Sequence, residues 1–422
     1  MKLRNIAANL ALITFSVPAA QAADTPTTPQ EANEQFTQAV GLRDGGNVGQ
    51  SIRNLQAMLD EQPGLDRIRL ELAVAYYRAL NFSKARELAQ EVLNKPSTPE
   101  SVRVTIRQFL AQIEKDSEPS VFTPFLSAGY IYDSNVNAGP GRSVLDIGGT
   151  QFTLDDASSK RSDSGLNALV GVNHRYLFDG TVNIAGSDAA ALWQSQLSYY
   201  NMSYESLSDY NLDVISLSTG PVLISADNWS FALPYQASDI YLGHEHLALF
   251  QALNPTVTYR FGAWEMGVDY QYQDKSFLRD DDEGRDSKLK SVGLSLGRSF
   301  ADGRYSAAVT VRDFRESADL SRYSNDGYDY GVILAARPWD GWEFSLRHNY
   351  RTSDYKGEEP VYGEARDDRE YRSAFGANYT FSSGMMENWM VGLTITETRN
   401  HSNISLYDYN RTQAGLNLSR SF

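Results

Sequence analysis

The sequence predicts a mainly β protein, in which a 14-stranded antiparallel β-barrel that spans a membrane follows a small domain of helical repeats. The first observation is a change of period. Apolar residues follow helical spacing before residue 120 and alternate with polar residues after it. The second observation is that short turns alternate along the chain with long polar loops. Barrels that cross a membrane place short turns at one end and long loops at the other.

Residues 1–22 have the features of an export signal. Lys2 and Arg4 supply positive charge, residues 6–17 are mostly apolar, and Ala20–Ala22 has the pattern of a cleavage site. We therefore expect cleavage after Ala22 and export of the remaining chain. No other segment contains 18 consecutive apolar residues, which excludes a transmembrane helix.

The charge and cysteine content narrow the possible partners. The formal charge is -15, and loss of Lys2 and Arg4 with the leader would lower it by two, to -17. Such a chain has no basic field that attracts phosphate, so nucleic acid is not an expected partner. The chain contains no Cys, which excludes disulfides and a lipid anchor on a terminal Cys.

Residues 23–119 are predicted to form the helical domain. Helices are expected near residues 30–43, 48–61, 65–79, 82–94 and 98–115. A repeat of 34 residues relates Asn47 to Asn81 and Leu59 to Leu93. This is the period of tetratricopeptide repeats, in which pairs of helices stack. An arbitrary small helical bundle is the alternative.

A stack of helical repeats usually binds a protein partner on its concave face. The candidate contacts for a substrate protein are Tyr76, Tyr77 and Arg78, which lie at the end of the third expected helix.

Residues 120–422 are predicted to form the barrel. In one typical stretch, Trp264, Met266 and Val268 alternate with small or polar residues. The apolar side of such strands would face lipid and the polar side would line a lumen. The expected strands are 121–135, 164–178, 187–201, 210–225, 229–241, 247–261, 264–277, 287–300, 304–316, 326–338, 341–353, 367–381, 388–400 and 406–422.

Three prolines fall inside expected strands. Pro221, Pro234 and Pro255 lie in the fourth, fifth and sixth strands. A closed sheet has no free edge, so each proline removes one hydrogen bond from the ladder. We expect bulges or a mechanically weak wall there. The loop at 136–163 is long enough to contain a further hairpin, so the count of fourteen could differ by two strands.

Two octapeptides are near-copies of each other. Residues 293–300 read GLSLGRSF and residues 415–422 read GLNLSRSF. We interpret both as strands that end at a membrane interface on Phe, where aromatic rings preferentially lie. Arg298 and Arg420 occupy outward positions where an apolar residue is more usual. Near an interface a long Arg side chain reaches water at a cost of only ~0–1 kcal/mol.

The most distinctive polar segment ends the first expected strand. Its candidate functional residues are Tyr132, Asp133, Ser134, Asn135 and Asn137. Asn and Asp side chains bond to their own backbone, so the segment is also consistent with an Asx-type turn that closes a strand. Both interpretations remain open at this point.

The stretch YDSNVN at 132–137, directly after a helical-repeat domain, resembles the surface lipoprotein assembly modulator family, the translocons of type XI secretion. The resemblance implies an outer-membrane barrel with its helical domain in the periplasm. It also implies a substrate protein exported to the cell surface, either a lipoprotein or a soluble haem-acquisition or host-interaction protein. The terminal Phe422 resembles the assembly signal of such barrels. Periplasmic chaperones, the barrel-assembly machinery, outer-membrane lipid and lipopolysaccharide are therefore expected partners.

Two other transport functions are open: a polysaccharide exporter, or a channel for nutrients or other solutes. No nucleotide-binding motif and no catalytic set stands out, so neither an enzyme nor a cofactor is expected. A hydrolase built from lumenal Ser, His and Asp is the weaker alternative. His244 and His246 share a spacing that could hold a metal, but a polar loop tip is favoured because further ligands are missing.

Overall fold

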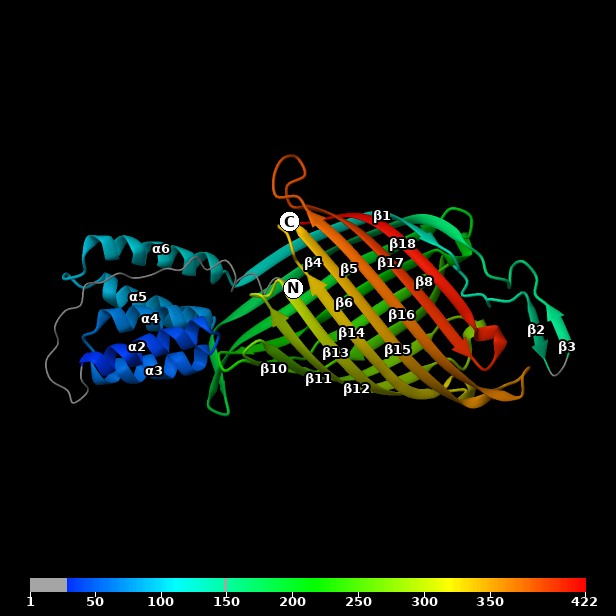
Figure 1. Cartoon of the computed structure of the whole chain (residues 1–422), viewed down its shortest axis with the longest axis horizontal. Helices are drawn as coiled ribbons and strands as arrows, with labels where there is room; N and C mark the ends of the chain where they lie inside the picture. Colours follow the sequence, from blue (N-terminus) through cyan, green and yellow to red (C-terminus); the bar gives the residue numbers. More distant parts are fainter. Residues whose placement is uncertain (1–28, 148–149) are drawn as a thin grey trace. The chain divides into compact units, whose positions relative to one another are not determined.

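The computed structural model describes residues 29–147 and 150–422, so the predicted export signal lies outside the described residues. Five helices form in the described part of the chain, each within two residues of its predicted bounds (Figure 1). They are α2 (Pro29–Asp44), α3 (Val48–Glu61), α4 (Asp66–Arg78), α5 (Phe82–Leu93) and α6 (Glu100–Asp116). None of these helices combines the length and the apolar content that crossing a membrane requires.

The helices are held together by an apolar core. Leu70 and Leu72 on α4 are fully buried, as are Leu55 on α3 and Ile106 and Phe109 on α6. The i, i+3 spacing of the α6 pair puts both side chains on one face, which explains why this stretch forms an amphipathic helix. Burial of each such side chain contributes about 1.5–3 kcal/mol, so packing rather than helix propensity stabilises the domain.

The chain divides into two compact units. One contains the helices together with residues 175–193 and 221–231, and the other contains residues 122–174, 194–220 and 232–422. The predicted boundary at residue 120 therefore separates helix from strand, while two short strand regions belong to the helical unit.

Within the helical unit, repeat-equivalent residues both contact the strand regions of that unit. Asn47 and Asn81 are 34 residues apart, and each is the N-cap of its helix, α3 or α5. The Asn47 Oδ1 atom accepts a hydrogen bond from Asn228 at 3.2 Å, and Asn81 Nδ2 lies 3.5 Å from Thr181 Oγ1. Next to these, Arg53 forms an ion pair with Asp227 at 2.8 Å.

The strands form one closed antiparallel sheet. Its segments are β1 (Ser120–Asp133), β4 (Asp163–Ile184), β5 (Ser187–Tyr204), β6 (Leu212–Ser225), β7 (Trp229–Ala232), β8 (Tyr235–Leu242), β9 (Glu245–Leu253), β10 (Thr256–Phe261), β11 (Trp264–Phe277), β12 (Ser287–Phe300), β13 (Tyr305–Ala318), β14 (Asn325–Ala336), β15 (Trp342–Glu359), β16 (Glu364–Thr380), β17 (Trp389–Ser402) and β18 (Tyr409–Ser421). These sixteen segments make fourteen strands, because β7 with β8 and β9 with β10 are each one strand in two pieces.

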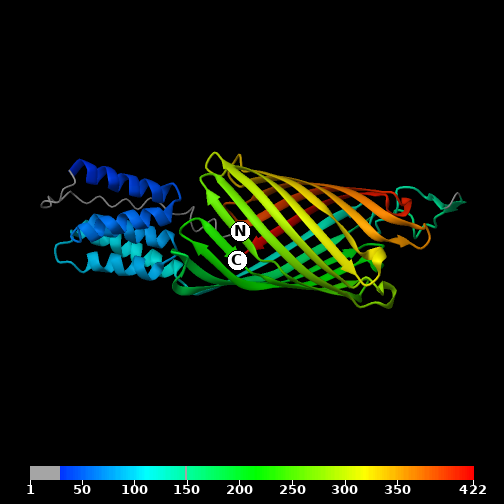
Figure 2. The ribbon, with the colours of Figure 1, turned by 90° about the horizontal axis from the view of Figure 1, so that it is seen from below.

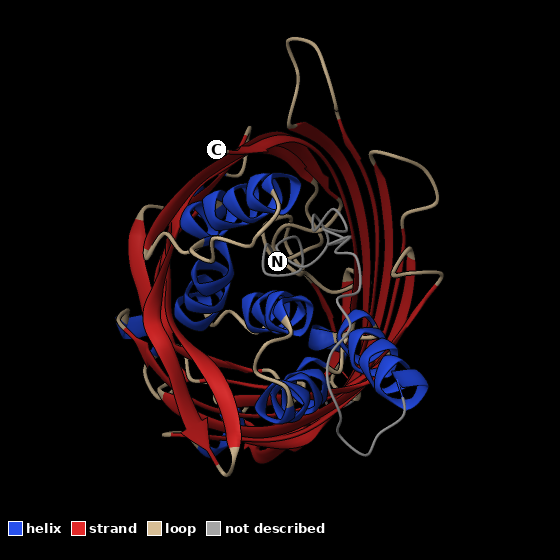
Figure 3. Ribbon diagram, turned by 90° about the vertical axis from the view of Figure 1, so that its left-hand side faces the viewer, coloured by secondary structure: helices blue, strands red, loops and turns tan. Residues whose placement is uncertain are grey.

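Strand order follows the chain, and β1 pairs with β18. The register of this pair runs from Phe125 opposite Ser421 to Asp133 opposite Gln413. Figure 3 shows the strands end-on as a ring, and Figure 2 shows β11 to β14 side by side and tilted. The predicted 14-stranded barrel is thus confirmed.

Two of the three prolines interrupt their strands as predicted. Pro234 lies between β7 and β8, and Pro255 lies between β9 and β10. Pro221 differs, because β6 continues through it without a break. The β8–β9 pair also shifts register between Ile240 and Tyr241. The wall between β6 and β11 is therefore the least regular part of the described ladder.

One strand end differs from its expected position. The second expected strand was predicted to end at residue 178, yet β4 continues to Ile184 and the chain turns at Ala185 and Gly186, both with positive φ. Gly180 also has a positive φ of 76°. The glycine at this position therefore marks an irregularity within the strand and not the end of the strand. The loop at 136–163 does contain a hairpin, β2 (Val144–Ile147) with β3 (Thr150–Thr153), but this forms a separate two-stranded sheet.

We predict that the proline-interrupted wall opens more readily than the rest of the barrel. Amide hydrogens in β6 to β10 should exchange faster than those in β12 to β17, because each Pro lacks the N–H that would join a neighbouring strand. Hydrogen exchange measured by mass spectrometry on the protein in detergent tests this. Equal protection in both walls would contradict it.

Candidate functional site

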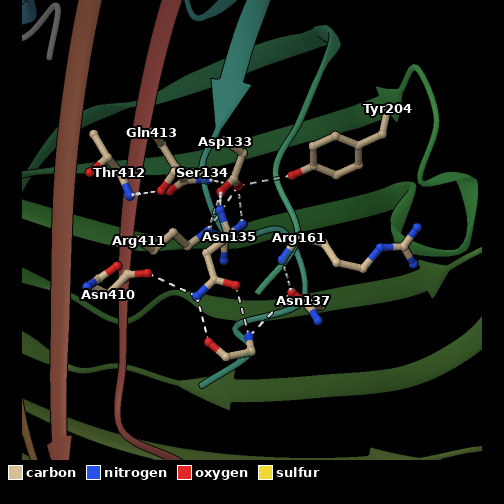
Figure 4. Close-up of polar contacts among 11 residues, drawn as sticks. Asp133, Ser134, Asn135, Asn137, Arg161, Tyr204, Asn410, Arg411, Thr412 and Gln413 are labelled. Carbon is tan, nitrogen blue, oxygen red and sulfur yellow. Dashed lines mark hydrogen bonds and ion pairs between the residues drawn. The ribbon is translucent and has the colours of Figure 1, made fainter. Parts of the chain in front are cut away.

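The predicted segment at the end of β1 is organised around one buried carboxylate. Asp133 is fully buried, and the Arg411 Nε atom donates to its Oδ1 and Oδ2 at 3.0 and 2.9 Å (Figure 4). Gln413 Nε2 donates to Oδ2 at 2.9 Å and the Tyr204 hydroxyl donates at 3.2 Å. The backbone N–H of Asn135 donates to Oδ1 at 2.9 Å, which is the Asx-type turn hydrogen bond.

This arrangement satisfies an otherwise costly charge. A buried carboxylate is stable only when it is paired and its remaining lone pairs are hydrogen-bonded. Asp133 meets both conditions through groups on β5, on β18 and in the loop that follows β1. Because Arg411 and Gln413 are on the last strand, the carboxylate also stabilises the β1–β18 pair, which is the seam at which the sheet closes.

Asn135 holds the first turn of the loop that follows. Its side chain is fully buried, and Nδ2 donates to the carbonyl oxygens of Gly139 and Asn410, both at 2.9 Å. Its Oδ1 accepts from the Gly139 backbone N–H at 2.9 Å. Ala138 in between adopts a φ of 49°, a conformation that costs energy and is held by these bonds.

Ser134 and Asn137 extend the same network in two directions. Ser134 N–H donates to the Thr412 carbonyl at 2.9 Å, and Ser134 Oγ accepts from Thr412 N–H at 2.7 Å. Asn137 Nδ2 donates to the Ser159 carbonyl at 2.8 Å, and its Oδ1 accepts from Arg161 N–H at 3.1 Å. The segment therefore ties both ends of the loop at 136–163 to β18.

The structure brings four of the five candidate residues together. Tyr132 is separate: its side chain is 46% exposed and lies on the outer face, because alternation points it away from Asp133. Arg411, Gln413 and Tyr204 complete the network and were missed by the sequence reasoning. The alternation of side chains along each strand predicts that these three residues point inward. That their strands lie beside Asp133 is decided only when the barrel closes.

The inner wall of the barrel carries the other charged groups. Arg312 pairs with Asp269 at 2.7 Å, and Lys275 pairs with Glu316 at 2.8 Å. Arg351 lies over the ring of Phe314, 4.1 Å from its centroid. These inward positions alternate with apolar residues such as Val309, Val311 and Leu346, whose side chains are 36–53% exposed on the outer face. The lumen is thus polar and contains internal ion pairs.

Arg347 and Arg372 are exceptions on this wall. Both side chains are exposed, and neither has an ion pair or hydrogen bond in the part of the chain that the structure describes. They lie on neighbouring strands as a diagonal pair, since Arg347 is opposite Ala374 and Arg372 is opposite Asn349. Diagonal neighbours of this kind are about 7–8 Å apart. The cross-strand neighbours are all uncharged: Ile333, Ala374, Asn349 and Thr398.

The candidate contacts on α4 are largely inaccessible. Tyr76 and Tyr77 are 8% and 3% exposed. The Tyr77 hydroxyl donates to Asp116, and burial, followed by this hydrogen bond, raises the pKa of Tyr77. Arg78 forms an ion pair with Asp44 at 3.1 Å, and burial together with the nearby Arg43 lowers the pKa of Arg78. The two rings therefore serve the core of the helical unit.

In the structure, His246 of the histidine pair contacts an acidic side chain. His246 Nε2 lies 2.5 Å from Asp239 Oδ1, on the neighbouring strand of a hairpin. Residues 29–147 and 150–422 contain no group of three or more side chains placed to hold a metal ion.

Comparison with known proteins gives one partial family match. A family model described as "Protein of unknown function (DUF2860)" matches residues 314–418, from β13 to β18. No curated protein matches the chain in sequence. The resemblance to surface lipoprotein assembly modulators remains a prediction.

Several solved structures are similar to part of the chain. OpdQ of Pseudomonas aeruginosa is 10% identical with a TM-score of 0.35, over 73% of this chain and 98% of that chain. The outer membrane protein OpdK of Pseudomonas aeruginosa is 11% identical with a TM-score of 0.36, over 72% and 99%. OccAB3 of Acinetobacter baumannii is 8% identical with a TM-score of 0.38, over 72% and 99%. Values this low carry no argument about function.

We predict that Asp133→Asn destabilises the barrel by about 3–5 kcal/mol, because it leaves the Arg411 guanidinium without its counter-charge. Urea unfolding in lipid vesicles, followed by tryptophan fluorescence, measures this free energy. Asp329→Asn is the matched control: this lumenal carboxylate is half-buried, stands opposite Arg312 and Arg351 without an ion pair to either among the described residues, and accepts a hydrogen bond from Asn349 at 3.0 Å, so the change should cost about 1 kcal/mol. Equal costs for both variants would show that Asp133 does not fasten the seam.

Proposed function

We propose that this chain is an outer-membrane channel that conducts small solutes and favours anions. The observation that carries the proposal is the pair Arg347 and Arg372, two lumenal guanidiniums without an acidic neighbour across either strand. Arg312 and Lys275 each pair with a lumenal carboxylate, whereas no acidic residue lies directly across from Arg347 or Arg372, so these two supply positive charge to the lumen. Rings or clusters of Arg in a pore select anions in this way.

The size of the barrel agrees with small solutes. Lumen width grows with strand number, and fourteen strands leave a narrower passage than the 16–18 strands of open porins. A narrow passage with a low-dielectric wall strengthens the field of each fixed charge on a passing ion. The selectivity of this channel should therefore depend on very few residues.

The location proposed for the chain follows from the same features. An exported barrel with an apolar outer face fits the outer membrane, with the short turns and the helical domain on the periplasmic side. Outer-membrane lipid and lipopolysaccharide would then surround it, and periplasmic chaperones and the barrel-assembly machinery would insert it.

We predict that the channel's anion preference depends on these two arginines. In planar bilayers under a salt gradient, the wild-type reversal potential should have the sign of a chloride-selective pore. In Arg347→Gln/Arg372→Gln it should move toward zero or change sign, with the chloride-to-potassium permeability ratio falling about tenfold or more.

Arg315→Gln is the control for this measurement, because Arg315 lies on the outer face of β13 and is 75% exposed. It should leave the reversal potential unchanged. A wild-type pore that prefers cations, or a double variant identical to wild type, would contradict the proposal.

Export of a protein is the second candidate, and a groove in the helical unit favours it. The groove has a volume of about 540 Å³ and is mainly apolar. Residues from all five described helices contribute to it, among them Phe36, Met58, Ile68, Val92 and Val102. A short apolar segment of a substrate protein would fit such a surface. The cargo and the secretion machinery implied by the family resemblance belong to this candidate.

Export predicts that Met58→Glu, on this groove, removes a specific protein from the cell surface or the medium. The comparison is the surface and secreted protein profile of the variant against those of wild type and a deletion strain. Identical profiles in all three strains would exclude export and leave the solute channel.

A further inference from the structure

The near-copies at 293–300 and 415–422 have the same surroundings in the structure. In the β11–β12 pair, Arg298 lies directly opposite Trp264, and in the β17–β18 pair, Arg420 lies directly opposite Trp389. In each copy a Phe follows two residues later, on the same face. Two separate places in the barrel thus carry the same set of three side chains, one Trp, one Arg and one Phe.

In both sets the guanidinium is held against the two rings. The Arg298 guanidinium carbon lies 5.0 Å from the centroid of Trp264 and 4.9 Å from that of Phe300. The Arg420 guanidinium carbon lies 5.6 Å from Trp389 and 4.9 Å from Phe422. Contacts at these distances are cation–π interactions, and they fix the orientation of a side chain that would otherwise be mobile.

The rings leave the charge without an anionic partner. Neither Arg298 nor Arg420 forms an ion pair or a hydrogen bond within the described ranges. Arg420 Nε is buried, so its terminal amino groups are the donors that a ligand could reach. A guanidinium has five N–H donors, and an aromatic face satisfies none of them along the plane of the group. The edge of each group is therefore free to bind an anion.

The position of the two sets indicates which anion is present. Both arginines project from the outer face, beside apolar residues such as Leu296 (38% exposed) and Leu416 (56% exposed). Both stand at the strand ends next to the short-turn side, where aromatic side chains mark a membrane interface. The anions at that depth are lipid phosphates, and the planar fork of Arg matches a phosphate bidentately.

A third aromatic cluster shows what distinguishes the two sets. Trp342 stacks on Phe344 with ring centroids 5.5 Å apart and lies opposite Tyr379, and no Arg from residues 29–147 or 150–422 stacks on these rings. An aromatic girdle therefore forms without a cation. The aromatic rings at this end of the barrel therefore do not need a guanidinium in order to pack together.

We propose that each set is a binding site for the phosphate of a phospholipid in the leaflet on the short-turn side. Trp and Phe hold the guanidinium and cover its faces, and the free N–H edge binds the headgroup phosphate. Each barrel then carries two such lipids at defined positions. The proposal does not depend on transport, because no residue of either set lines the lumen.

Native mass spectrometry of the detergent-purified protein with added phosphatidylglycerol tests the proposal. The wild type should retain two phospholipids under conditions that remove the rest. Arg298→Ala and Arg420→Ala should each lose one, and the double variant both, with about tenfold weaker binding per site. Diacylglycerol, which lacks phosphate, should bind all variants equally. Lipid A, added as a competitor, separates a general phosphate site from one shaped for phospholipid.

Arg347→Gln/Arg372→Gln is the matched control, because it removes two arginines from the lumen and should retain both phospholipids. Folding of every variant is checked by the heat-dependent shift in gel mobility. Folded Arg298→Ala/Arg420→Ala that retains both phospholipids would overturn the proposal, as would equal loss in the lumenal control. If the variants do not fold, Arg→Lys at both positions keeps the charge without the fork and should weaken phosphatidylglycerol binding.

Discussion

Closure of the sheet is the constraint on which the rest of the barrel depends. Inside a bilayer every backbone N–H and C=O must find a partner in the protein, so the first strand has to meet the last. At this seam between β1 and β18, the fully buried carboxylate of Asp133 accepts hydrogen bonds from Arg411 and Gln413 on β18. Backbone pairing alone would tolerate a slipped register, whereas a buried charge tolerates only the register that neutralises it.

The same seam positions the loop that follows it. The side chains of Asn135 and Asn137 form hydrogen bonds with backbone groups of the loop and of β18. The long segment at 136–163 therefore begins at a fixed position. The YDSNVN segment therefore needs no catalytic or ligand-binding role to explain its composition. Each polar atom that stands out in the sequence has a structural partner, as buried polar groups require.

Arginine has three different roles in this barrel, set by which face it occupies. Arg411 forms an ion pair with Asp133 at the seam, and Arg298 lies against two aromatic rings on the outer face. Arg347 faces the lumen without an ion pair among the described residues. The side chain is the same in each case, and its surroundings decide whether the charge is neutralised, acts on solutes or meets lipid. Alternation along the strands separates the last two roles by a single residue step.

The sequence by itself determined the period of the strands, the fourteen-strand count, the helix bounds and the likeness of the two octapeptides, because these depend on neighbours within a few residues. Even the breaks at Pro234 and Pro255 are local effects of a missing N–H. Only the tertiary structure decided that Asp133 meets Arg411, 278 residues away, and that Arg298 lies over Trp264. Such pairs arise when the sheet closes and sets a register, which no local pattern encodes.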